Sequence, residues 1–336
     1  RVFSAAYHFR RFLQKTLPDH LPESPDPRPL GAALPGSISG KGSLIPSEIL
    51  ERWPPARTEL LSGSEVELNG LPIDSYVPPV EQVGTTGAAR AALERFLSSV
   101  LPRYAEDRNH PDLNATSGLS PYLHFGIISP HEVFASVGAQ EGWTPLRLSD
   151  RTDGARSGWW GMGGGAEAFL DHLVTWRELG FNMASKQENH RAFESLPGWA
   201  RDTLAAHEGD PRPHRYSLEE FREARTHDPL WNAAQQQLRT EGIVHNYLRM
   251  LWGKKILEWS GSARDALDVM IELNDGLALD GQDPNSYSGI FWCLARYDRG
   301  WPERPIFGKV RSMTSRSPRR KVKLNEYLSR FTLEPD

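Results

Sequence analysis

Three tryptophans in the second half of the chain are spaced so that their indole rings could pass electrons. Trp252 and Trp259 are seven residues apart, which places them on one face of a helix. Trp231 lies on the preceding helical segment, and a turn at Gly242 would fold the two segments alongside each other. The rings could then form a file from the interior to the surface. The same spacing also suits an aromatic core stripe, and these residues alone leave both interpretations open.

Charged side chains lie near these tryptophans in the sequence. Arg249 lies one helical turn before Trp252, and an arginine on a buried helix face needs a carboxylate partner. The polar loop that leads toward Trp292 supplies two carboxylates, Asp280 and Asp283. We therefore predict that Arg249 pairs with a carboxylate of this loop.

A third block combines hydroxyl groups with a glycine. The segment Thr116–Leu123 reads TSGLSPYL, and its hydroxyls and backbone amides can hold phosphate oxygens. The glycine cluster Gly161–Gly165 fits neither the dinucleotide fingerprint nor the P-loop spacing, so we interpret it as a flexible loop. The 11 histidines show no metal-ligand spacing, and we predict no metal site.

The composition is that of a globular chain with an unusual number of tryptophans. Of 336 residues, 38% are hydrophobic, 24% are charged and 11 are Trp. A single cysteine, Cys293, excludes internal disulfides and cysteine-rich zinc sites, and it favours a cytoplasmic location. No apolar run approaches the roughly 18 residues that would span a membrane. The N-terminus also lacks the apolar core of a signal peptide, so we expect no membrane association.

Positive charge is concentrated near the C-terminus. The net charge of the chain is -4, yet residues 296–330 contain 11 Lys or Arg and 3 Asp or Glu. The densest part, Arg316–Lys323, reads RSPRRKVK. Such a segment suits phosphate binding and equally suits a solvated basic tail, and the charge alone does not decide between them.

The residues singled out above fall on predicted helices. Cap residues followed by a first-turn proline, as in Ser129-Pro130 and Asp228-Pro229, mark helix starts. We predict helices at residues 87–101, 130–137, 166–185, 217–225, 229–241, 243–259, 263–275, 284–296 and 324–331. Residues 1–17 read as the end of a helix. Residues 18–80 read as a Pro/Gly-rich linker with one helical turn near Pro46–Glu51. Because strand signals are sparse, the predicted fold class is mainly α.

Five ordered motifs together resemble the photolyase/cryptochrome superfamily, and class II cyclobutane pyrimidine dimer photolyases most closely. They read SGLSPYLHFG, THDPLWNAAQ, YLRMLWGKKILEW, LNDGLALDGQDPNSYSGIFW and ERPIFGKVR. The resemblance runs from Tyr104 to Arg311. It implies a helical FAD-binding and DNA-docking domain of photolyase type over residues 81–336. Residues 1–80 would be the remnant of an α/β antenna domain followed by the interdomain linker.

The resemblance also implies roles for single residues. FAD would be bound without a covalent link, and the residues that would hold it are Tyr104, Thr116, Ser117, Gly118, Leu119, Ser120, Arg177, Asn246, Arg249, Asp280, Asp283 and Asn285. Asn274 would lie beside flavin N5, where an amide can either donate or accept a hydrogen bond. Trp252, Trp231 and Trp259 would carry electrons inward when the flavin is photoreduced. Met250 would lie between the flavin and the DNA lesion.

The activity implied by the resemblance is light-driven repair of UV-damaged DNA. A pyrimidine dimer must be flipped out of the duplex, and Trp176 and Trp292 would line its pocket and replace the lost stacking. Arg311 would also contact the DNA. Excited reduced FAD would give an electron to the dimer, the cyclobutane ring would split, and the electron would return.

His172 departs from the motif of the resembled class. It stands four residues before Trp176, where class II relatives carry a glutamate that contacts the dimer. We expect His172 to take over that contact and to titrate between about pH 5.5 and 7.5. Burial would lower its pKa, whereas Asp171 or Glu178 would raise it or replace it as the lesion contact.

Two further interpretations stay open. A cryptochrome-type photoreceptor would use the same tryptophan relay for signalling without repair, and a degraded copy is a weaker alternative. Trp176, Trp292 and the basic C-terminal segment favour repair. We expect a monomer whose partner is UV-damaged DNA.

Overall fold

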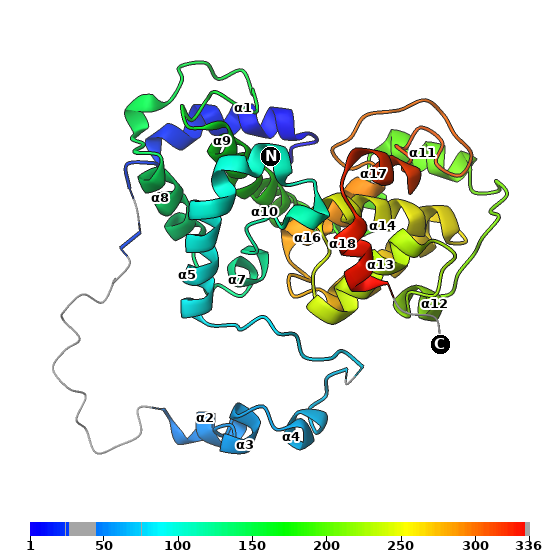
Figure 1. Cartoon of the computed structure of the whole chain (residues 1–336), viewed down its shortest axis with the longest axis horizontal. Coiled ribbons are helices and arrows are strands. Elements are labelled where there is room, and N and C mark those ends of the chain that lie inside the picture. Colours follow the sequence, from blue (N-terminus) through cyan, green and yellow to red (C-terminus); the bar gives the residue numbers. More distant parts are fainter. Residues whose placement is uncertain (24, 27–44, 75, 333–336) are drawn as a thin grey trace. The chain divides into compact units, whose positions relative to one another are not determined.

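The structure, a computed structural model, describes residues 1–23, 25–26, 45–74 and 76–332 (Figure 1). The chain divides into two compact units. The first unit contains Arg1–Pro22 and Pro79–Asp336, and the second contains Glu23–Pro78. Within the described residues there is no β-strand, only one isolated bridge between Arg304 and Gly308. The predicted mainly α fold class is confirmed.

The second unit contains three short helices where the sequence predicts a linker with one turn. They are α2 (Ser47–Arg52), α3 (Thr58–Leu61) and α4 (Glu65–Asn69). The predicted turn near Pro46–Glu51 corresponds to α2. The other two are too short to show a helical period in the sequence. Much of the Pro/Gly-rich stretch, residues 27–44, lies outside the described residues.

The first unit is built from helices whose bounds mostly agree with the predicted ones. Those with a predicted counterpart are α1 (Ala6–Thr16), α5 (Thr86–Arg95), α8 (Pro130–Gln140), α9 (Gly164–Leu170), α10 (Arg177–Lys186), α12 (Leu218–Arg222), α13 (Pro229–Glu241), α14 (Asn246–Trp259), α15 (Ala263–Leu277), α16 (Pro284–Cys293) and α18 (Asn325–Phe331). Four more helices were not predicted: α6 (Tyr104–Asp107), α7 (Ser120–His124), α11 (Gly198–Ala206) and α17 (Arg316–Lys321).

Local chemistry explains the best-predicted helix. The carboxylate of Asp228 accepts hydrogen bonds from the backbone N–H groups of Leu230 and Trp231, which begins α13. Gly242 ends the helix in the left-handed conformation, with φ 65°. A Cβ at Gly242 would lie 2.6 Å from Cγ of Leu279, so glycine is also required by close packing. Helices α13 and α14 then pack together with α18 around a shared apolar cluster (Figure 1).

Several predicted helix ends differ from the observed ones by three residues or more, and the predicted helix at residues 166–185 is interrupted. Helix α14 begins at Asn246 rather than at 243, because the left-handed turn at Gly242 delays it. Helix α16 ends at Cys293 rather than at 296, because Ala295 adopts a positive φ of 79°. Between α9 and α10, the segment Asp171–Trp176 is π-helical. Such segments change the direction of side chains and are frequent at functional sites.

The first helix belongs to the same compact unit as residues 79–336, which differs from the expected division at residue 80. Helix α1 packs on α10 through an apolar cluster that includes Phe9, Leu179 and Tyr297. The buried guanidinium of Arg10 donates to both carboxylate oxygens of Asp171, at 2.7 and 3.1 Å. The chain therefore leaves this unit after α1 and returns to it at Pro79.

Candidate functional site

The three tryptophans of the predicted relay are buried and individually held. Their exposed fractions are 0% for Trp231, 3% for Trp252 and 2% for Trp259. The indole N–H of Trp231 donates to the backbone carbonyl of Trp252 at 3.0 Å, and the indole N–H of Trp252 donates to Oε1 of Gln235 at 2.8 Å. The rings of Trp231 and Trp259 lie 5.8 Å apart between centroids, at 70°. The structure thus brings the predicted file together as fixed neighbours in the core.

The far end of the file does not reach solvent directly. Trp259 is covered by the ring of Tyr216, at 5.5 Å, and by the ring of His227, at 5.0 Å. The Tyr216 hydroxyl and Nδ1 of His227 are 2.6 Å apart. The expected file from interior to surface therefore ends beneath two partly exposed aromatic side chains.

A polar network lies at the predicted site around Arg249. Its guanidinium donates to Oδ1 of Asn274 at 3.2 Å and lies 3.6 Å from Oδ1 of Asp280. The amide nitrogen of Asn274 donates to the hydroxyl of Ser286 at 2.8 Å. The hydroxyl of Ser120 donates to the other carboxylate oxygen of Asp280. Residues from three separate motifs therefore meet at one place.

The segment Thr116–Ser120 forms one edge of this network. The carbonyl oxygens of Thr116 and Ser117 each accept a hydrogen bond from Arg95 at 3.3 Å. Gly118 has a positive φ of 68°, which favours glycine, and Leu119 is buried. Ser120 begins α7. The turn therefore brings the Ser120 hydroxyl to Asp280.

Some buried polar atoms of this network and of the start of α14 have no hydrogen-bond partner. Among the described residues, Oδ1 of Asp280 and both ring nitrogens of His245 are buried without a hydrogen-bond partner. Burial lowers the pKa of His245 to about 4, so its imidazole is neutral near pH 7. Buried polar atoms in native proteins are nearly always satisfied, so such a group marks a place for a ligand or water.

Two other predicted cofactor residues, Tyr104 and Arg177, form contacts with side chains outside this network. The Tyr104 hydroxyl bonds to Nδ1 of His172 at 2.8 Å. Arg177 forms an ion pair with Glu178, and its guanidinium lies 4.4 Å from the ring centroid of Phe181. The structure does not bring Tyr104 or Arg177 to the Arg249 network by any recorded contact.

The remaining three predicted cofactor residues lie at helix starts. The carboxylate of Asp283 accepts from the backbone N–H of Asn285 at 2.8 Å, which caps α16, and it lies 3.3 Å from Nδ1 of His124. The side chains of Asn246 and Asn285 are exposed at the first turns of α14 and α16. Their amides are accessible to a ligand but make no recorded contact with the network.

The two tryptophans predicted to line the lesion pocket share one apolar cluster. Trp176 and Trp292 both pack, partly buried, against the cluster formed by α1, α10 and Tyr297. A Cβ at Gly180 would lie 2.8 Å from the carbonyl oxygen of Pro284, so this glycine allows α10 to approach the start of α16. That close approach packs α10, which directly follows Trp176, against α16, which carries Trp292. Met250 is half-buried on α14.

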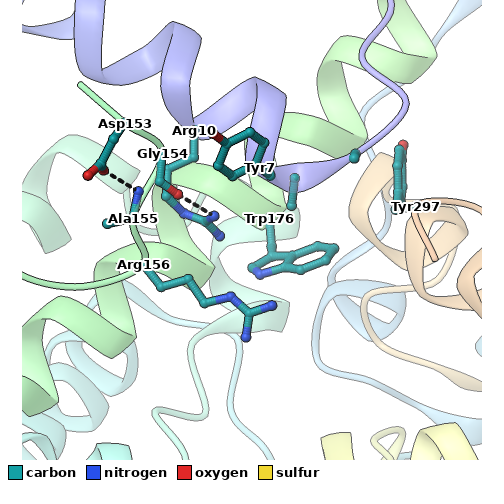
Figure 2. Close-up of a pocket in the computed structure, with 10 residues that line it drawn as sticks. Tyr7, Arg10, Asp153, Gly154, Ala155, Arg156, Trp176 and Tyr297 are labelled. Carbon is teal, nitrogen blue, oxygen red and sulfur yellow. Dashed lines mark hydrogen bonds between the residues drawn. The ribbon is translucent and has the colours of Figure 1, made fainter. Parts of the chain in front are cut away.

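A cavity of about 610 Å³ opens beside Trp176. It is lined by residues of α1 and of the loop before α9, including Tyr7, Arg10 and Arg156, as well as by Tyr297. Figure 2 shows the Arg156 guanidinium extending toward the side of the cavity occupied by the Trp176 indole. Sequence reasoning missed these lining residues, because no motif or period connects α1 with residues 153–156.

His172 is half-buried and follows the buried Asp171. Burial, reinforced by Arg108, lowers the pKa of His172 to about 4. Asp171 opposes this lowering of the pKa but does not overcome it, and its carboxylate is paired with Arg10. The expected titration between about pH 5.5 and 7.5 is therefore wrong for the folded protein. The carboxylates of Asp171 and Glu178 are each engaged in an ion pair, with Arg10 and Arg177.

The basic C-terminal segment is accessible. The side chains of Arg316, Arg319, Arg320, Lys321 and Lys323 are all exposed on or just after α17. Arg311 is also exposed, and its guanidinium lies 5.7 Å from the ring centroid of Trp292. Positive charge therefore extends from α17 to one of the two pocket tryptophans.

No cluster of three or more potential metal ligands occurs in the described part of the chain. No helix among the same residues is long and apolar enough to cross a bilayer.

The chain is similar to several deoxyribodipyrimidine photolyases. It is 41% identical to that of Methanothermobacter thermautotrophicus over 74% of this chain and 51% of the relative. It is 38% identical to that of Potorous tridactylus over 77% and 46%. It is 33% identical to that of Arabidopsis thaliana over 97% and 60%. The chain thus spans about half the length of the curated relatives it matches. No protein-family model matches it.

Solved structures show the same fold. A bacterial class III photolyase from Agrobacterium tumefaciens aligns with a TM-score of 0.57 at 19% identity, over 79% of this chain and 49% of that chain. A cryptochrome from Synechocystis aligns with a TM-score of 0.54 at 17% identity, over 78% and 48%. These two likenesses concern the fold alone.

Proposed function

Because the chain belongs to the photolyase/cryptochrome superfamily, we propose that it is the FAD-binding, DNA-docking part of a class II deoxyribodipyrimidine photolyase that repairs cyclobutane pyrimidine dimers with light. One observation supports this more than any other. The buried file formed by Trp231, Trp252 and Trp259 occurs in the same compact unit as the adjoining Trp176 and Trp292. A file of indoles suits electron supply, and an aromatic pocket suits an unstacked base.

The polar network offers suitable contacts for FAD. Arg249, Asn274 and Asp280 would bind the polar edge of the flavin ring, and Thr116–Ser120 would bind the phosphates and ribose. The buried Oδ1 of Asp280 and the ring nitrogens of His245, none of which takes part in a hydrogen bond with another described residue, support this fit, because a bound cofactor would satisfy them. When bound, reduced FAD supplies a light-excited one-electron donor. The protein contributes position, orientation and electrostatics.

The lesion would be held between this network and α1. Trp176 and Trp292 would stack on the flipped dimer, each stacked base contributing roughly 1–3 kcal/mol. In the tautomer in which the Tyr104 hydroxyl donates to Nδ1, neutral His172 carries its proton on Nε2 and would donate it in a hydrogen bond to the dimer. The exposed Arg311 and the basic residues of α17 would contact phosphates on either side of the lesion.

A cytoplasmic location and a monomeric state belong to the same proposal. The lone cysteine, Cys293, is buried and free, which suits a reducing compartment. Cryptochrome-type signalling is the second candidate function. The observation that favours it is the complete tryptophan file, since such a relay also serves a photoreceptor that repairs nothing.

One repair assay separates these functions. The protein is loaded with FAD, photoreduced with a thiol, mixed with a single-stranded oligonucleotide that contains one thymine dimer, and illuminated. Repair restores the absorbance of two thymines, and a sample kept in the dark is the control. We expect restoration only in the light. A protein that binds FAD and photoreduces it yet leaves the dimer intact fits the photoreceptor, and a folded protein that binds no FAD contradicts both functions.

A further inference from the structure

A lysine is buried against Trp292 without a carboxylate partner. Lys254 is 1% exposed, and its ammonium donates to the backbone carbonyl of Cys293 at 2.6 Å. The same ammonium lies 5.4 Å from the ring centroid of Trp292. Within the part of the chain that the structure describes, no Asp or Glu lies within ion-pair distance of it. Trp292 therefore faces a full positive charge in the protein interior.

The next residue provides a contrast. Lys255 is 8% exposed, and its ammonium lies 5.2 Å from the ring centroid of Trp259. Unlike Lys254, it forms an ion pair with Glu258, at 2.6 Å. Adjacent lysines thus contact two different tryptophans, and only the cation beside Trp259 is neutralised.

A positive charge beside an indole ring makes it harder to remove an electron from that ring. Oxidation leaves a radical cation, which an adjacent ammonium repels and an adjacent neutral ion pair does not. The repulsion is larger in the interior than in water, because the effective dielectric constant is lower. Arg311 adds a second cation 5.7 Å from the Trp292 ring, but its exposure weakens it through solvent screening.

We propose that Lys254 protects Trp292 from oxidation and so confines electron supply to the Trp252 file. The inference rests on the proposed function, in which light-excited oxidised FAD takes one electron from a nearby indole. One electron leaves the indole, the flavin gains it, and an external thiol later refills the indole. Without Lys254, Trp292 would compete with Trp252 as the electron donor. A radical would then form on the indole of Trp292, in the wall of the lesion pocket beside the DNA.

The first test uses the fluorescence lifetime of bound FAD. Trp252→Phe removes the donor of the proposed file, so the lifetime in this variant reports the remaining donors. Adding Lys254→Met, which keeps the length of the side chain but removes its charge, should shorten the lifetime by about twofold or more. Adding Trp292→Phe as a third substitution should restore it. Adding Lys255→Met instead should leave the lifetime unchanged.

These variants separate an electrostatic role from a structural one. Lys254 also satisfies a carbonyl at the end of α16, so Lys254→Met could disturb packing. A disturbed α16 would not be rescued by Trp292→Phe, whereas removal of a newly active donor would be. A lifetime that stays short in the triple variant, or that never shortens in the double variant, overturns the proposal.

The second test needs no cofactor. Burial lowers the pKa of Lys254 to about 8, with Cys293 and Asp298 opposing the shift and Arg311 adding to it. Lys254 is therefore charged below about pH 8 and neutral above it. In the apoprotein, the contribution of Trp292 to the fluorescence is the difference between wild type and Trp292→Phe. This contribution should change as the pH passes through about 8. In a Lys254→Met background it should not change with pH.

The two tests fail in distinguishable ways. If the fluorescence of Trp292 does not titrate with Lys254, the two residues are not electrostatically coupled and the proposal is wrong, whatever the protein does. If the coupling is present but the folded protein binds no FAD, the proposed function fails, and with it the role of Lys254 in directing electrons.

Discussion

The hydroxyl of Tyr104 lies 2.8 Å from Nδ1 of His172, with the two rings at 77°. Tyr104 is buried, and burial raises its pKa to about 12, so its hydroxyl stays protonated and neutral. The same environment lowers the pKa of His172 to about 4. The pair is therefore uncharged across the neutral range, and His172 is held in one orientation by a tyrosine from another helix.

We predict that repair per absorbed photon is flat between pH 5.5 and 7.5, because His172 stays neutral there. Wild type and His172→Gln should give parallel curves in this range, measured as quantum yield on a dimer-containing oligonucleotide. A yield that rises in wild type as the pH falls from 7.5 to 5.5, and that is level in His172→Gln, would show a charged His172.

The lowered pKa of His172 should also make the free energy of unfolding depend on pH. Between about pH 6.5 and 4, the unfolded chain binds a proton at His172 that the folded chain does not bind. Stability therefore falls as the pH falls through this window. His172→Gln should lessen the fall, as measured by denaturant midpoints at pH 7 and pH 5. Equal losses in both proteins would place the acid sensitivity elsewhere.

Trp252→Phe should stop photoreduction of oxidised FAD and leave repair by chemically reduced protein nearly intact, because the relay supplies the flavin and takes no part in the repair cycle. Flash photolysis and the repair assay measure the two steps separately. Trp160→Phe is a suitable control, since Trp160 is 7% exposed in a different apolar cluster. Loss of both steps in Trp252→Phe would mean that Trp252 has a structural role.

Asp280→Asn should weaken FAD binding by about tenfold to a hundredfold, because a charge-assisted contact is lost while the shape is kept. Arg249 and Ser120 would then face an amide in place of a carboxylate. Equilibrium dialysis of FAD measures the change. Asp268→Asn, at an exposed position of α15, is the matched control. Equal affinities in the two variants would place the cofactor elsewhere.

Replacing Arg319, Arg320 and Lys321 with alanine should reduce the dependence of DNA binding on salt. If all three contact phosphates of a single strand, the slope of log affinity against log salt should fall in magnitude by about 2. Affinity for damaged and undamaged strands should fall alike. Removing Arg90 and Arg264, two exposed arginines in ion pairs with glutamates, serves as the control.

Local signals predicted much of this fold. The bounds of α13 were predicted correctly because each signal lies within one turn of the helix end that it marks. These signals are the cap at Asp228, the proline after it and Gly242. The shared face of Trp252 and Trp259 was predicted for the same reason, since both lie on α14, whereas Trp231 on α13 was placed beside them through the turn at Gly242. Arg249 and Asp280 came from the family motifs, and the structure places them within 3.6 Å.

The features that sequence reasoning missed depend on distant contacts. Tyr104 meets His172 across 68 residues, and Arg10 meets Asp171 across 161. No pattern in either segment indicates the other. The charge state of His172 and the isolation of Lys254 follow from such contacts, so their pKa shifts could not be read from the sequence.

The long sequence separation between Arg10 and Asp171 also delays the burial of α1 during synthesis on the ribosome. Helix α1 is synthesised before its partner carboxylate, which follows 161 residues after Arg10. At about 5–20 residues per second, α1 waits roughly 8 to 30 seconds for the segment that buries it. During that interval its apolar face, with Phe9 at its centre, has no native partner. The apolar face of α1 thus stays without its partners on α10 until Leu179 and Met183 have also been synthesised.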